Sequence, residues 1–155
     1  MKHVNKSVLL WYSPSEMYQL VTAIEDYPRF LPWCDHAAVI EQHDDGVTAR
    51  IGLAYAGVKH AFTTRNEHTP GASVIVKLVD GPFSLLDGTW RFVPLPASEG
   101  ATAKACKVEF DLRYNFANGV WNNKVKAYMA EQMAIEKIKN YDGFVFANTT
   151  GDLQF

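Results

Sequence analysis

Apolar and polar residues alternate along the middle of the chain, and the pattern is clearest over residues 106–116. There every second residue is apolar and the residues between are charged or polar. An alternation with period two predicts a strand with one buried face and one face in water. Shorter stretches of the same kind predict further strands within residues 4–10, 47–55, 60–65, 74–79 and 90–93. The Asp-Gly pairs Asp45-Gly46 and Asp87-Gly88 predict turns between these strands.

Two parts of the chain have helical character instead. Ser13, Pro14 and Glu16 predict the start of a short helix, with Ser13 as the N-cap and Glu16 completing a capping box. Pro28 ends this helical stretch. The segment from about 120 to 141 has no Pro or Gly and many helix formers, which predicts a helix of about 30 Å.

The predicted elements follow the order strand, one or two short helices, about six antiparallel strands and one long helix. This order is typical of an α+β fold, and the length suits a single domain over residues 1–155. A long helix needs an apolar surface to cover, and the inner face of a curved antiparallel sheet provides one. We expect an apolar pocket wherever the curvature of the sheet and the helix fail to match.

Composition and charge narrow the class of protein. Apolar residues make up 48% of the chain and charged residues 21%, as in ordinary globular domains. The formal net charge of −2 gives no reason to expect DNA as a partner. No stretch is long enough to span a membrane and no secretory signal is recognisable. We therefore expect a cytoplasmic protein that meets the inner membrane only peripherally, with Cys34 and Cys106 as reduced thiols.

The sequence offers little for catalysis. No spacing typical of a metal site, a phosphate-binding loop or a nucleophile elbow occurs. Cys34 lies close to His36, but proximity along the chain does not make a nucleophile and its base. His60 shares a strand face with Phe62 and is a candidate pocket donor or acid, although a histidine at a strand edge, or one with its hydrogen bonds satisfied, is the favoured interpretation. We expect no catalytic residue, no metal and no required cofactor.

The long predicted helix carries polar residues inside its apolar stripe. Gln132 and Glu136 fall in the same sector as Val125 and Met129. They either lie at the helix margin and reach water, or face a partly hydrated cavity and contact the head group of a ligand. Met129 and Met133 suit an adaptable pocket as well as an ordinary core.

Two segments combine aromatic residues with turn-forming prolines. Residues 27–34 hold three large aromatic side chains and two prolines, and residues 79–83 place Phe83 directly after a Gly-Pro turn. Each segment either closes an end of the sheet by packing or forms one side of the mouth of an apolar pocket.

The first of these segments, Tyr27–Cys34, resembles the YPxFLPWC signature of the coenzyme Q-binding START-domain family. The bacterial members of that family include the RatA-type ribosome association toxins. Phe62–Arg65 is similar to the family's central strand, and Asp80–Phe92 is similar to its DGPFxxLxGxWxF stretch. Leu112–Asn118 resembles the last strand and the turn into the long helix. The matches span nearly the whole chain in order.

This resemblance implies a helix-grip fold. A curved antiparallel sheet of six or seven strands would wrap around the C-terminal helix, with two short helices after the first strand. It also implies an apolar cavity. The ligand site is then expected at Trp33, Phe62, Phe83, Trp90, Phe110, Leu112, Tyr114, Val125, Met129, Gln132, Met133 and Glu136.

Three functions follow from the resemblance and the expected cavity. The first is non-catalytic binding or chaperoning of ubiquinone or a similar isoprenoid lipid, in support of respiration. The alternative is a RatA-type toxin that binds the large ribosomal subunit and blocks subunit association. The third is an enzyme similar to polyketide cyclases, with His60 or Glu136 as acid or base.

Overall fold

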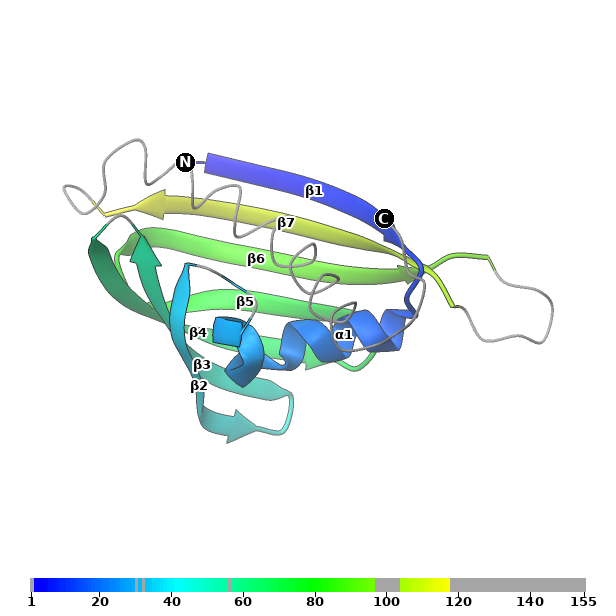
Figure 1. The fold of residues 1–155 in the computed structure, drawn as a ribbon, viewed down its shortest axis with the longest axis horizontal. Helices are drawn as coiled ribbons and strands as arrows, with labels where there is room; N and C mark the ends of the chain where they lie inside the picture. The colour runs from blue at the N-terminus through cyan, green and yellow to red at the C-terminus, as the bar shows by residue number, and fades with distance from the viewer. Residues whose placement is uncertain (1, 30, 32, 56, 97–103, 118–155) are drawn as a thin grey trace.

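The computed structural model describes residues 2–29, 31, 33–55, 57–96 and 104–117. In that part of the chain seven strands and two short helical segments follow one another (Figure 1). The elements are β1 (Lys2–Leu10), α1 (Pro14–Thr22), the 3-10 helix η1 (Ile24–Arg29), β2 (Cys34–His43), β3 (Gly46–Tyr55), β4 (Val58–Thr69), β5 (Ser73–Asp80), β6 (Phe83–Pro94) and β7 (Cys106–Phe116). The helix predicted over about 120–141 lies outside the described residues.

The seven strands form one antiparallel sheet in the order β1-β7-β6-β5-β4-β3-β2. Strands β2 to β7 each pair with their neighbour in the chain, and β1 joins the edge next to β7. The α+β class and the antiparallel sheet of six or seven strands are therefore confirmed, as are the two short helical segments after the first strand.

The alternation that predicts β7 is reproduced in its burial. The side chains at even positions from Cys106 to Phe116 are buried, and those between them are partly or fully exposed. The matching positions of β6 and β1 lie opposite in register, with Trp90 against Phe110 and Val8 against Val108. The apolar side chains of neighbouring strands consequently form one continuous inner surface.

The turn predicted at Asp87-Gly88 is wrong. Both residues lie inside β6, where Gly88 pairs with Val76 on one side and Leu112 on the other. Local preference for a turn gives way here to strand pairing on both sides. Gly88 has no side chain and so leaves a gap on the inner face of the sheet. A Cβ added at this position would lie 3.2 Å from Cδ1 of Leu112.

Strand β2 is an element that the sequence pattern did not predict. Its pairing with β3 shifts register twice, between Cys34 and His36 and again between Val39 and Glu41. Each irregularity inserts a residue and moves the following side chains to the opposite face. The apolar residues of this edge strand therefore show no regular period of two.

The helical segments begin as their residues predict. The Oγ of Ser13 accepts from the backbone N–H of Glu16 at 3.1 Å, and Oε1 of Glu16 accepts from the N–H of Ser13 at 3.1 Å. This reciprocal capping box stabilises the first turn of α1. Beyond α1, the phenol of Tyr27 in η1 donates a hydrogen bond to the carbonyl of Val21, which ties the two helical segments together.

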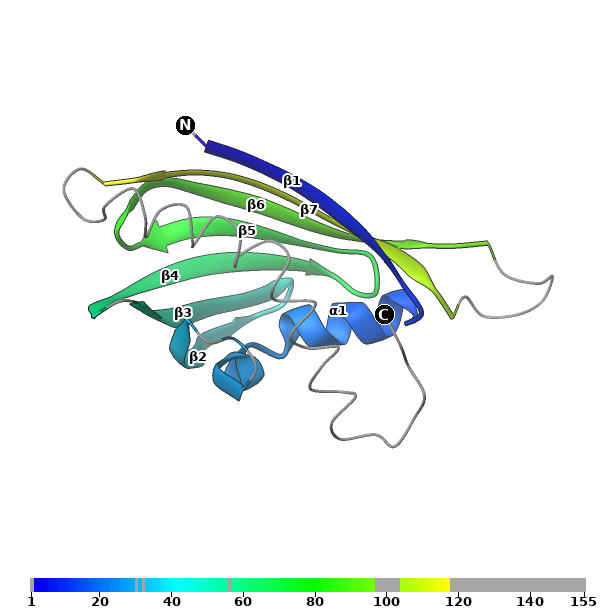
Figure 2. The same ribbon diagram turned by 45° about the horizontal axis from the view of Figure 1, so that its top comes forward.

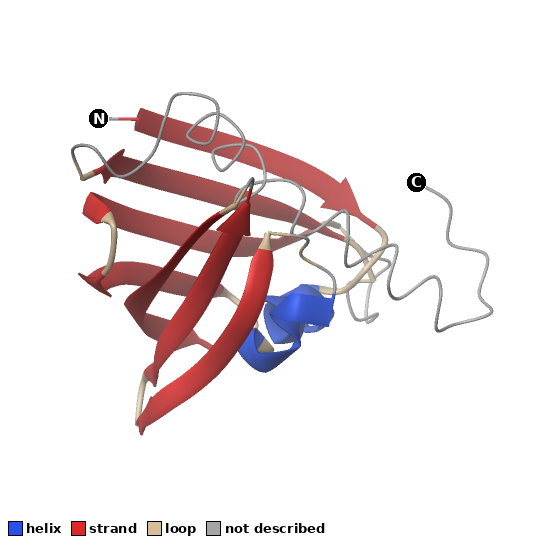
Figure 3. Cartoon of the chain, turned by 60° about the vertical axis from the view of Figure 1, so that its left-hand side comes forward, coloured by secondary structure: helices blue, strands red, loops and turns tan. Residues whose placement is uncertain are grey.

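The sheet is strongly curved, and both helical segments lie at its concave side (Figures 2 and 3). Helix α1 packs against β5, β6 and β7, and η1 packs against β2. Met17, Leu20 and Val21 of α1 are buried there, together with Ile24 of η1. The core therefore lies between the concave face and the helices, and this is where a cavity remains.

Candidate functional site

An apolar cavity opens on the concave face of the sheet. The empty space there, with the open solvent at its mouth included, is about 640 Å³. Five of the seven strands and both helical segments contribute to its wall. The lining residues are Val21, Ile24, Tyr27, Trp33, Ile51, Phe62, Thr64, Asn66, Val74, Val76, Leu86, Gly88, Trp90, Phe110 and Leu112.

Aromatic side chains form one wall of the cavity. Trp90 and Phe110 occupy opposed positions on β6 and β7, and their rings stack with centroids 4.1 Å apart. Phe62 on β4 meets Phe83 edge to face at 5.5 Å, and Phe83 in turn stacks on Phe116 at 4.8 Å. Such ring pairs hold one another in fixed orientations, so this wall is stiff.

A polar pair interrupts the apolar lining. Thr64 and Asn66 lie two residues apart on β4 and share the inner face. The hydroxyl of Thr64 donates to Oδ1 of Asn66 at 2.8 Å. Tyr27 is the other hydroxyl among the described lining residues, and burial, reinforced by the nearby Cys34, raises the pKa of its phenol. Each hydroxyl therefore lines the cavity as a neutral group.

The residues expected at the ligand site fall into three groups. Trp33, Phe62, Trp90, Phe110 and Leu112 line the cavity. Phe83 and Tyr114 are buried in the same core but are not among the lining residues. The residues predicted from the long helix lie outside the described part of the chain, and they are Val125, Met129, Gln132, Met133 and Glu136.

Sequence reasoning missed several lining residues that the structure brings together. Asn66 is the most informative, because it is one of the few polar residues among the described lining residues. Extending the alternation of Phe62 and Thr64 by one more step along β4 would have identified it. Gly88 was missed because its neighbour Asp87 made it resemble a turn residue.

Among the described residues, the groups considered for chemistry do not line the cavity, and Glu136 lies outside the described part of the chain. His60 is exposed, and it is not among the lining residues. Cys34 is buried and its Sγ lies 3.4 Å from the carbonyl oxygen of His36. Within the described ranges, no group of three or more His, Cys, Asp or Glu residues is arranged to hold a metal ion.

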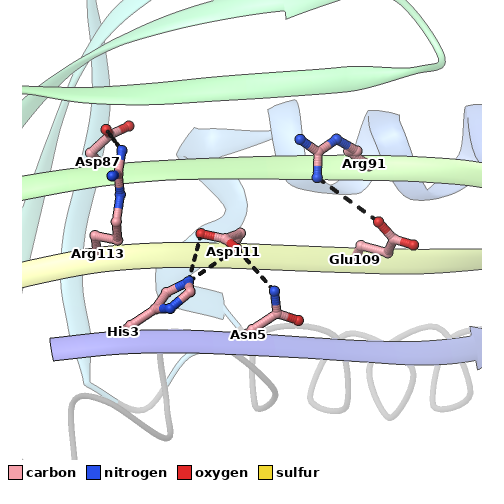
Figure 4. A network of polar contacts seen from close by, with 7 residues as sticks. All are labelled: His3, Asn5, Asp87, Arg91, Glu109, Asp111 and Arg113. Carbon is pink, nitrogen blue, oxygen red and sulfur yellow. Dashed lines mark hydrogen bonds and ion pairs between the residues drawn. The ribbon is translucent and has the colours of Figure 1, made fainter.

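The opposite face of the sheet carries a network of paired charges (Figure 4). Asp111 on β7 accepts from Asn5 at 2.9 Å and lies 3.0 Å from Nε2 of His3, both on β1. Arg113 donates to Asp87 on β6 at 2.7 Å. The hydrogen bond from His3 is the main reason that the pKa of Asp111 is lowered. These contacts connect three strands and pair opposite charges across them.

The family described as polyketide cyclase / dehydrase and lipid transport matches residues 10–131. This span runs from the end of β1 past the end of β7 and covers most of the chain. The chain belongs to this family. The family resemblance found in the sequence motifs is thereby confirmed.

Within the family, the chain is similar to the ribosome association toxins RatA. RatA of Escherichia coli (strain K12) is 39% identical over 118 residues, which are 76% of this chain and 71% of that protein. RatA of Vibrio cholerae (strain ATCC 39315) is 41% identical over the same length, 76% of this chain and 78% of that protein. The mitochondrial coenzyme Q-binding protein homolog B of Xenopus laevis is 23% identical over 128 residues, 82% of this chain and 51% of that protein.

Solved structures of other proteins share the fold. The START superfamily protein from Mycobacterium smegmatis matches with a TM-score of 0.76 at 20% identity, over 95% of this chain and 99% of that one. The Zhui aromatase/cyclase from Streptomyces sp. R1128 matches with a TM-score of 0.65 at 16% identity, over 94% of this chain and 90% of that one. At such identities the likeness establishes the START-like fold alone. Among the described residues, no helix is both long and apolar enough to cross a bilayer.

Proposed function

We propose that this chain associates with the large ribosomal subunit in the cytoplasm and blocks subunit joining. The observation that carries the proposal is its similarity to RatA, at 39% and 41% identity over 118 residues in two organisms. The similarity to a coenzyme Q-binding protein is much lower, at 23%. Ribosome association, the alternative that the sequence motifs implied, is therefore better supported than quinone carriage.

An exposed apolar patch at one end of the sheet is our candidate contact for the ribosome. Trp11 lies just beyond β1 and is 72% exposed, and Leu9, two residues before it, is 64% exposed. Leu9 on β1 and Val93 on β6 both pair in register with Lys107 of β7, which puts a cation between two apolar side chains. Tryptophan is among the residues enriched in interaction hot spots.

Co-sedimentation with purified ribosomal subunits tests this proposal. The protein is mixed with small or large subunits and centrifuged through sucrose at low and at moderate salt. We expect it in the large-subunit fraction at both salt concentrations, and we expect Trp11→Ser to weaken binding by about fivefold or more. Absence from the large-subunit fraction at both salt concentrations would overturn the proposal.

A second candidate function is binding of a hydrophobic molecule such as ubiquinone or another isoprenoid. The observation that favours it is the apolar cavity on the concave face, lined by Trp33, Trp90 and Phe110. Each buried methylene group contributes about 0.8 kcal/mol, so a short isoprenoid segment provides useful affinity. The family description, which includes lipid transport, also supports this candidate. Release of such a ligand would involve peripheral contact with a membrane.

Mass spectrometry of the organic extract of the purified protein tests ligand binding. We expect a stoichiometric apolar compound from the wild type and less of it from Gly88→Val, whose added side chain narrows the cavity beside Leu112. Trp11→Ser is the matched control, because Trp11 is not among the cavity residues. If the two functions are independent, Trp11→Ser should weaken ribosome binding and leave ligand content unchanged. Gly88→Val should lower ligand content and leave ribosome binding unchanged. An empty extract, with no uptake of added quinone, would exclude the carrier function.

A further inference from the structure

Exposed apolar side chains gather at the end of the sheet where β1 and β6 end and β7 begins (Figure 1). Leu9 and Trp11 are 64% and 72% exposed, and the buried Leu10 lies between them in the chain. Val93 on β6 is 40% exposed and shares a row with Leu9, with Lys107 of β7 between the two. The ring of Trp11 therefore presents most of its surface to solvent.

Cations outnumber carboxylates beside these apolar side chains. Nζ of Lys107 lies 3.3 Å from one oxygen of Glu109, and Nη1 of Arg91 lies 4.0 Å from the other (Figure 4). Lys104, two residues before β7, is exposed as well. Glu16 also lies near the start of β7, and its carboxylate is engaged in the capping box. Three cations thus stand against two carboxylates, although the formal net charge of the chain is −2.

Farther along β6 and β7 the charges of the outer face are paired one to one. Arg113 donates to Asp87 at 2.7 Å, and Nε2 of His3 lies 3.0 Å from Asp111. The positive surplus is therefore found at the end of the face that carries Trp11. A local surplus of positive charge favours a polyanion as partner.

An exposed aromatic ring with cations on the neighbouring strands suits an unpaired RNA nucleotide. Unpaired bases stack on aromatic side chains, while Lys and Arg contact the phosphates. Neighbouring strands lie about 4.8 Å apart, so the cations of β6 and β7 lie close to the end of β1. A double helix offers no free face to Trp11, because its bases are stacked on one another.

We propose that Trp11 stacks on an unpaired nucleotide of the RNA of the large ribosomal subunit, and that Lys107 and Arg91 contact the adjacent phosphates. The proposal rests on ribosome association and specifies the chemistry of the contact. Glu109 positions the two cations, since each lies within 4.0 Å of its carboxylate. Stacking requires a flat ring at position 11, whereas contact with a protein or a bilayer requires only an apolar side chain.

Trp11→Phe and Trp11→Leu separate these two requirements. Phenylalanine keeps a flat ring, and leucine keeps an apolar side chain without one. Each variant is titrated against purified large subunits, and co-sedimentation measures the affinity. We expect Trp11→Phe to bind within about twofold of the wild type and Trp11→Leu to bind about fivefold or more weakly. Both variants should unfold at the wild-type temperature, because Trp11 is largely exposed.

A single-stranded RNA probe tests the contact without the ribosome. A fluorescein-labelled RNA of mixed sequence and about twelve nucleotides is titrated with the intact protein, and fluorescence anisotropy reports binding. The same RNA annealed to its complement is the duplex control. We expect the wild type to bind the single strand about fivefold or more tightly than the duplex, and Trp11→Leu to lose this preference.

Lys107→Gln tests the phosphate contact. Loss of one cation should weaken binding of the single strand and lower the slope of log affinity against log salt concentration by about 0.7. Lys77→Gln is the matched control, because it removes the same charge from β5, where the side chain of Lys77 is 60% exposed. We expect Lys77→Gln to keep the wild-type affinity and slope. Equal effects of the two variants would mean that net charge alone matters, and would overturn a local contact.

The outcomes separate this contact from ribosome association itself. Equal affinities of Trp11→Phe and Trp11→Leu for the large subunit would overturn stacking and leave ribosome association intact. No binding of the single strand by the wild type would also overturn it, as would tighter binding to phosphatidylglycerol vesicles than to the single strand. Binding of the single strand without binding of large subunits would contradict ribosome association and leave the RNA contact.

Discussion

Trp90 and Phe110 stack at 4.1 Å from directly opposed positions on β6 and β7, and this pair forms a wall of the cavity. Residues 90 and 110 are separated along the chain but lie directly opposite each other in the sheet. The stack explains how a curved sheet keeps an open interior. Because the two rings pack against each other, they form the wall of the cavity and do not occupy the space inside it.

Loss of one ring of this pair should be costly. Phe110→Ala removes a buried ring together with its stacking on Trp90, and we expect a loss of about 3–5 kcal/mol in the free energy of unfolding. Urea denaturation measures it. The control is Val93→Ala on β6, since Val93 is 40% exposed and should cost about 0.5 kcal/mol or less. Equal losses for the two variants would contradict the packing described here.

Gly81 should tolerate no side chain. Its φ of +152° lies outside the range that other residues favour, and an added Cβ would approach Cβ of Phe62 to 2.5 Å. Gly71 has φ of +71° but open space around it, so Gly71→Ala suffers only the backbone strain of about 1–2 kcal/mol. We expect thermal unfolding at a clearly lower temperature for Gly81→Ala than for Gly71→Ala. The reverse order would show that the turn before β6 is wrongly described.

The capping box should contribute measurably to stability. Ser13→Ala removes the acceptor for the N–H of Glu16, and we expect a loss of about 1 kcal/mol in the free energy of unfolding. Ser13→Asp keeps an acceptor and should retain most of the stability. Urea titrations of the three proteins in parallel provide the comparison, and an Ala variant as stable as the Asp variant would argue against the box.

Cys106 should make stability depend on pH in the alkaline range. Burial, followed by the nearby charge of Glu16, raises the pKa of its thiol from 9.0 to about 11. Between these values the unfolded chain releases the proton that the folded protein keeps, so folding becomes less favourable as pH rises. The stability difference between wild type and Cys106→Ala should therefore shrink from pH 8 to pH 10.5. A difference that is constant with pH would mean that this thiol titrates normally.

The sequence predicts strands best where pairing is regular. Strand β7 is read directly from its alternation, because a strand paired on both sides buries one face along its whole length. Strand β2 escapes detection because two register shifts break its period. Gly88 is misread because a local Asp-Gly signal carries no information about the strands that pair with β6.

The residues of the candidate site also divide into those that the sequence predicts and those that it does not. Trp90, Phe110 and Leu112 are predictable lining residues, because each lies on the apolar face of an alternating strand. The position of Asn66 between Val47 and Val76 is not predictable, because it depends on how β4 pairs with β3 and β5. Register across three strands decides that relationship, and no local pattern encodes it.

Ribosome association is tested most directly by light scattering of subunits that are joining. Purified large subunits are incubated with increasing amounts of the protein before small subunits are added, and the rise in scattering reports joining. We expect the amplitude to fall as the protein approaches the concentration of large subunits, and to fall much less with Trp11→Ser. An unchanged amplitude at a large excess of the folded wild-type protein would contradict a RatA-type function for this chain.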